Sequence, residues 1–149
     1  MIESLGLTFS YPLRLMATWL AVGVLKVVGV SVSAERTLIA LDSGATQIAV
    51  TDACGGLEQL GGLVAVGLLF AWIMQKGWGW RILHWTTILP CVVLANAVRL
   101  IVTVLLVRAY GDVILGDAWH VSLGWSQTVL AVGLLWLFGK AIAYVARKK

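Results

Sequence analysis

One of the two cysteines, Cys54, stands at the boundary between a polar segment and a long apolar segment. Two glycines, Gly55 and Gly56, follow it where a helix is expected to begin, and Glu58 lies four residues after it, on the same helical face. A thiolate attacks a carbonyl carbon whereas a thiol does not, so such a cysteine needs neighbours that favour the ionised form. The stretch therefore has the residue types of a cysteine nucleophile, with backbone N–H groups that could bind an oxyanion.

Two further polar groups stand in or beside apolar segments and could act with this cysteine. Asn96 and Arg99 share one face of a predicted helix, and His120 shares a face of the next one with Gln127. An arginine at membrane depth is costly unless it is paired or serves a site. Arg99 would favour the thiolate or donate hydrogen bonds to the oxyanion. His120 could accept the thiol proton and return it to the leaving amine.

Each of these residues also has a purely structural interpretation. A lone interfacial cysteine is usually a small apolar residue in a packed position. Arg99 could be paired with Glu58 or with an aspartate on the outer side, and His120 could belong to an aromatic belt at the membrane surface. Asn96 more readily hydrogen-bonds a neighbouring helix or orients Arg99, and Glu58 could simply favour the start of its helix. The convergence of Cys54, Arg99 and His120 on one side of a membrane favours the catalytic interpretation.

The composition indicates an integral membrane protein of one domain. The chain has 149 residues, of which 60% are hydrophobic and 12% charged, whereas soluble domains are about a quarter charged. The net charge of +4 does not indicate nucleic-acid binding, because the basic residues lie at membrane boundaries. Two distant cysteines without a CxxC spacing argue against a structural zinc site and a thiol redox enzyme. No metal and no other cofactor is expected.

The hydropathy pattern predicts an all-α membrane protein with about four transmembrane helices over residues 1–149. The expected spans are approximately 13–32, 57–73, 82–107 and 121–145. Pro90 predicts a kink in the third span. The first span could also be a cleaved signal peptide, although its apolar run is longer than a usual signal core.

A short β-hairpin is predicted outside the membrane, before the second helix. Residues 37–41 and 46–50 are β-branched and partly alternating, and a turn signal at 42–45 separates them. An isolated hairpin is only marginally stable in water, so this one should rest on the helix ends. Its position would deliver Cys54 to the mouth of the second span.

The basic residues predict the orientation of the chain. Lysines and arginines cluster near the N-terminus, around residues 76–81 and at the C-terminus, and such segments stay in the cytoplasm. Both termini are therefore expected inside, and the hairpin and the loop before His120 outside. Arg99 would lie in the outer half of the third span, from which its long side chain could extend outward.

With these positions assigned, the sequence resembles the exosortase/archaeosortase family of membrane cysteine transpeptidases. Ala53-Cys54-Gly55-Gly56-Leu57 is similar to its Cys-Ser-Gly motif, Asn96-Ala97-Val98-Arg99 to its Asn-x-x-Arg motif, and His120 with Gly124-Trp125 to its histidine motif. The resemblance extends over roughly residues 31–138. Gly55 departs from the usual serine, Glu58 replaces a basic or polar residue, and the chain lacks the additional N-terminal spans of many members.

The resemblance implies an enzyme of the cell membrane with an outward-facing site. Catalytic roles would fall to Cys54, Arg99 and His120, and the substrates would be membrane-anchored proteins with a C-terminal sorting signal. Such an enzyme would cut the signal and transfer or release the product. The alternative is a non-catalytic membrane module or degenerate relative that binds sorting signals or partner helices.

Overall fold

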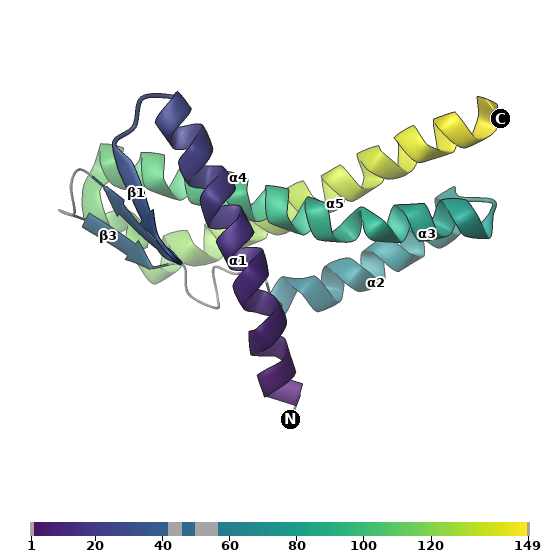
Figure 1. Cartoon of the computed structure of the whole chain (residues 1–149), viewed down its shortest axis with the longest axis horizontal. Coiled ribbons are helices and arrows are strands. Elements are labelled where there is room, and N and C mark those ends of the chain that lie inside the picture. Colours follow the sequence, from purple (N-terminus) through teal and green to yellow (C-terminus); the bar gives the residue numbers. More distant parts are fainter. Residues whose placement is uncertain (1, 42–45, 50–56, 149) are drawn as a thin grey trace.

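The computed structural model describes residues 2–41, 46–49 and 57–148, and most of them are helical. The helices are α1 (Ile2–Val27), α2 (Leu57–Met74), α3 (Trp78–Thr86), α4 (Ile88–Tyr110) and α5 (Asp117–Lys148), with a short 3-10 helix, η3 (Gly111–Leu115), between the last two. Figure 1 shows α2, α4 and α5 lying along broadly the same axis, with α4 running opposite to the other two, whereas α1 runs across them. A small sheet lies near the end of α4 that leads into α5 (Figure 1).

Two helical segments of the described chain are long and apolar enough to cross a membrane. They are Trp78–Tyr110, which combines α3 and α4, and Val121–Lys148 in α5. These segments agree with the third and fourth expected spans. The apolar part of α2, Gly61–Met74, is shorter. The spans expected at 13–32 and 57–73 therefore stay predictions, and the transverse course of α1 was not foreseen.

Near the kink predicted in the third span, the helix is interrupted between α3 and α4, one turn before Pro90. Proline has no N–H, so the carbonyl of Thr86, four residues earlier, lacks its helical partner. The hydroxyl of Thr87 donates to the carbonyl of His84 at 2.6 Å. The regular ladder resumes where the Cys91 N–H donates to the Thr87 carbonyl at 3.1 Å. The helix is thus interrupted at a position that the proline chemistry explains, and the kink itself stays a prediction.

The sheet has three antiparallel strands, β1 (Val32–Glu35), β2 (Leu38–Leu41) and β3 (Thr46–Ala49). The pairing of β2 with β3, from Leu38 opposite Ala49 to Leu41 opposite Thr46, confirms the predicted hairpin. The turn expected at 42–45 lies outside the described residues. The first strand, β1, was not predicted from the sequence. It pairs with β2 at the edge of the hairpin, with Val32 opposite Leu41. Three strands with one apolar face are more stable than an isolated hairpin.

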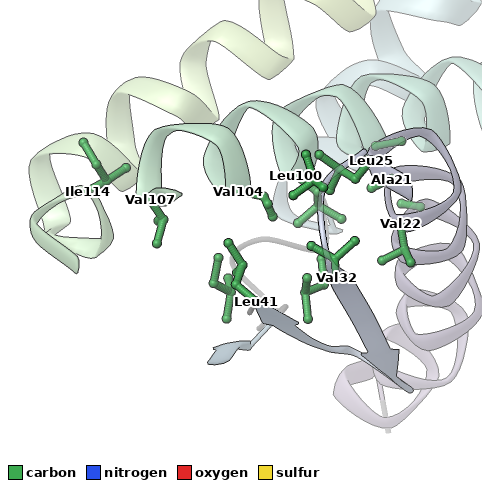
Figure 2. Close-up of a cluster of buried hydrophobic side chains, with 14 of the residues drawn as sticks. Ala21, Val22, Leu25, Val32, Leu41, Leu100, Val104, Val107 and Ile114 are labelled. Carbon is green, nitrogen blue, oxygen red and sulfur yellow. The ribbon is translucent and has the colours of Figure 1, made fainter. Parts of the chain in front are cut away.

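One apolar core joins α1, the sheet and α4 (Figure 2). Ala17, Ala21 and Leu25 are spaced by four residues, so they form one buried stripe on α1. Figure 2 shows Val32 and Leu41 of the sheet between α1 and α4. The members of this core from α4 are Val93, Ala97, Leu100, Val104 and Val107. Alanines on α1 allow the two helices to approach closely where they cross.

A second core joins α2, α4 and α5, and a polar contact lies beyond it, near the end of α2. The side chain of Gln75 is almost completely buried, and its Nε2 donates to the carbonyl of Gly139 in α5 at 2.9 Å. The same Nε2 lies 3.5 Å from Nδ1 of His84, which is fully buried. Gly139 is thus a position where α5 contacts these groups.

Replacing Gly139 with alanine is expected to destabilise the protein. A Cβ at this position would lie 2.6 Å from Cε1 of His84 and 2.9 Å from Sδ of Met74. Overpacking of this kind costs about 1–3 kcal/mol. Thermal unfolding of the detergent-solubilised protein would measure the loss. Gly133→Ala is the matched control on the same helix, because a Cβ there meets no atom within 4 Å. Equal melting temperatures for the two variants would contradict the proposed contact.

Candidate active site

Arg99 is buried between α4 and α5, where it contacts Gln127. Only 5% of Arg99 and 2% of Gln127 is exposed. The Nη1 of Arg99 donates to Oε1 of Gln127 at 3.0 Å. A hydrogen bond from a charged donor is stronger than a neutral one, and the planar guanidinium fixes its direction. The arginine is therefore held toward α5 at this level of the helix pair.

Asn96 lies one turn before Arg99 on α4 and is 1% exposed. Its Oδ1 accepts no hydrogen bond from any group within the described part of the chain. A buried acceptor without a partner costs free energy. On the other side of Arg99, the hydroxyl of Thr103 donates to the Arg99 carbonyl at 2.9 Å. The predicted polar face of this helix is thus present in the structure.

A cavity of about 310 Å³ adjoins this pair of side chains. Arg99 and Gln127 form part of its wall, and the rest is mostly apolar, with Val98 and Val102 from α4 and Leu123 from α5. Val98 is 44% exposed, so the cavity lies at the surface of the helix pair. The arrangement places hydrogen-bond donors of a guanidinium beside a space large enough for a few amino-acid side chains.

His120 lies on the same helix as Gln127 but nearer its beginning. Its backbone belongs to the first turn of α5, and its side chain lies outside the described part of the structure. The two residues are seven apart, which is about 10 Å along a helix. Because Arg99 donates a hydrogen bond to Gln127, its contact with α5 lies about two helical turns from His120. Because the side chain of His120 is not described, a contact between Arg99 and His120 stays a prediction.

The predicted nucleophile lies outside the described residues. Cys54, Gly55 and Gly56 belong to the segment between the end of β3 and Leu57, where α2 begins. Glu58 is the second residue of α2, and its side chain is also outside the described part. The sheet and α2 thus fix the two ends of the segment that carries Cys54. The second cysteine, Cys91, is fully buried in the core of α2, α4 and α5, as a packing residue would be.

Gln127 is the site residue that the sequence interpretation did not select. The signal was present, because Gln127 shares a helical face with His120, but an uncharged side chain did not suggest a partner for Arg99. Among the side chains that the structure describes, no group of three or more His, Cys, Asp or Glu residues could hold a metal ion.

Comparison with known proteins adds one match. The family model described as transmembrane exosortase matches residues 2–138, which is most of the chain. No curated protein and no solved structure matches the chain.

Proposed function

Because the chain belongs to the transmembrane exosortase family, we propose that it is a membrane cysteine transpeptidase or protease. It acts on membrane-anchored proteins, from which it cuts a C-terminal sorting signal at the outer face of the cell membrane. The observation that carries the proposal is the family match over residues 2–138. The buried pair of Arg99 and Gln127 next to a cavity supports it from the structure.

The proposed reaction has two stages, and Cys54 is the nucleophile in the first. Its thiolate attacks the scissile carbonyl carbon, the C–N bond breaks, and the product is a thioester on Cys54. His120 takes the thiol proton and gives it to the departing amine. In the second stage an acceptor attacks the thioester, its proton passes to His120, and the thiolate is regenerated. Water would release the product, whereas an amine or lipid hydroxyl would receive it.

In the proposed reaction, Arg99 stabilises the negatively charged species. A fixed guanidinium stabilises the thiolate or the oxyanion of the tetrahedral intermediate, and its donors need no reorganisation when the charge develops. Its hydrogen bond to Gln127 supports such a fixed orientation. Gly55 and Gly56 could add backbone N–H donors at the start of α2. Asn96 and Glu58 have supporting roles, in orienting Arg99 or His120.

Co-expression with a candidate substrate tests the proposal. The substrate is a protein with a C-terminal membrane anchor and an epitope tag on each side of the sorting signal. An active enzyme separates the two tags, and mass spectrometry of the N-terminal fragment identifies the cut and any attached acceptor. The alternative, a binding module without catalysis, is favoured by Gly55 in place of the family's usual serine. That alternative predicts an intact substrate that co-purifies with the protein.

The orientation of the chain gives a separate prediction. The distribution of lysine and arginine predicts that the segment around Ser43 lies outside and Lys76 inside. In a variant without other reactive cysteines, a cysteine at position 43 should react with a membrane-impermeant thiol reagent in intact cells. A cysteine at position 76 should react only after the membrane is permeabilised. The reverse pattern would place the site on the cytoplasmic side and overturn its proposed location.

A further inference from the structure

A second cavity, of about 490 Å³, lies between α1 and the turn that follows β1. Its α1 wall includes Trp19, Gly23 and Lys26, and Arg36 reaches it from the sheet. This wall is next to the stripe of α1 that packs on α4. Among the residues that the structure describes, Asn96 and Arg99 of the proposed site do not line this cavity. It therefore calls for an explanation of its own.

The backbone at Arg36 is unusual. The residue has a φ of 57° and is the first of the two residues that connect β1 to β2. This is the left-handed region, which a residue with a Cβ adopts at a cost, and glycine or asparagine is preferred at such turn positions. Backbone strain of this kind often accompanies functional sites, so the turn that carries Arg36 is a candidate for one.

The charged side chains that line the cavity, among those the structure describes, are both positive. Lys26 and Arg36 both line it, and both are exposed to solvent or lipid. Glu35, the one carboxylate whose side chain the structure describes, lines a different cavity with Ser33 and Gln47. Among the described residues, neither cation forms an ion pair. Two like charges on one cavity repel each other, and an anion bound between them would relieve that repulsion.

We propose that this cavity binds the headgroup of an anionic phospholipid. A guanidinium and an ammonium group are the usual protein partners of phosphate, and Arg36 could make two parallel hydrogen bonds to it. The ring of Trp19 and the side chain of Leu15 provide an apolar wall along which acyl chains can lie. The proposal does not depend on the catalytic function.

Native mass spectrometry of the full chain in detergent provides the test. The protein is titrated with phosphatidylglycerol, with phosphatidylcholine and with inorganic phosphate. We expect one phosphatidylglycerol to bind in a saturable manner and more tightly than phosphatidylcholine, whose choline group is repelled by the two cations. Inorganic phosphate should not compete at similar concentrations. Lys26→Gln and Arg36→Asn should each weaken phosphatidylglycerol binding about tenfold, because each removes a charge-assisted hydrogen bond.

Matched variants separate the cavity from general effects of charge and size. Arg108→Gln removes a positive charge from an exposed position that does not line the cavity, so binding should be unchanged. Gly23→Leu should block the cavity while the fold is kept, since a Cβ at Gly23 meets no atom within 4 Å. Gly133→Leu, at an equally open position on α5, should have no effect on binding.

Stability measurements complete the design. Arg36→Asn should melt at the same temperature as the unmodified protein or higher, because asparagine tolerates the left-handed conformation. A loss of lipid binding without a loss of stability supports the proposal. Equal affinity for the two lipids, or unchanged affinity in Lys26→Gln, Arg36→Asn and Gly23→Leu, would overturn it. Competition by inorganic phosphate alone would assign the site to a free anion and would overturn the lipid as occupant.

Discussion

Processing of a co-expressed substrate should be abolished when Cys54 is replaced with alanine. The thiolate is the attacking group of the proposed reaction, and no other side chain of the site can form the thioester. Cys54→Ser should also lose most of the activity, because a hydroxyl is hard to ionise without a strong base. The amounts of intact and cleaved substrate on an immunoblot measure both effects, with membrane fractions analysed to confirm that each variant accumulates.

Cys91→Ala is the control for the loss of a cysteine. Cys91 is completely buried in the core of α2, α4 and α5, so its replacement by a slightly smaller residue should leave processing nearly normal. For the same reason iodoacetamide should modify Cys54 faster than Cys91 in the folded protein. Normal processing by Cys54→Ala would end the transpeptidase proposal and leave the binding module as the better explanation.

The second large effect is expected at Arg99. Arg99→Lys keeps the charge but loses the planar fork that bonds Gln127 in a fixed direction. If the guanidinium stabilises the oxyanion or thiolate, the processing rate should fall about 10²–10³-fold, as it does when an oxyanion donor is removed. Insertion into the membrane should be retained, because lysine can extend toward the membrane surface. The initial rate of substrate cleavage in isolated membranes is the measurement.

Gln127 allows the orientation of Arg99 to be tested separately. Gln127→Leu removes the acceptor 3.0 Å from Nη1 while the guanidinium stays. Processing should fall by less than in Arg99→Lys, and combining the two substitutions should add little, because they act on one interaction. If Arg99→Lys cleaves substrate at the normal rate, a generic positive charge is sufficient. If Arg99→Ala fails to accumulate in the membrane, the arginine has a structural role instead.

The helices and the hairpin could be predicted because their signals are local. Apolar runs of sufficient length mark α4 and α5, and the β-branched segments around residues 38–41 and 46–49 mark two strands. The break before α4 followed from the missing N–H of Pro90. In each case a short stretch of sequence contains the whole physical cause.

The missed features depend on contacts between distant parts of the chain. The segment that forms β1, Val-Ser-Ala-Glu, has weak strand propensity and becomes a strand because β2 offers an edge to pair with. The transverse course of α1 depends on how its alanine stripe meets α4, which hydropathy does not encode. Similarly, the burial of Gln75 is explained only by its hydrogen bond to the carbonyl of Gly139, which belongs to another helix.

For the candidate site, the sequence provided residue types and faces but not all of the partners. The polar face that carries Asn96 and Arg99 was predicted from spacing, and both residues are buried on it. The hydrogen-bond partner of Arg99 was not predicted. Helical spacing places Gln127 and His120 on one face of α5, but it does not show which of the two residues contacts Arg99. The roles of Cys54 and His120 stay predictions for the experiments above.

The crossing of α1 over α4 also constrains the order in which the chain can fold. Ala17 and Ala97 belong to the same core but are about 80 residues apart in the sequence. At translation rates of about 5–20 residues per second, α4 is completed roughly 4–16 seconds after α1. During that interval the buried stripe of α1 has no α4 to cover it, so the lipid bilayer or the insertion machinery must cover it. The helix α1 is therefore made well before α4 and reaches its final position only after α4 is complete.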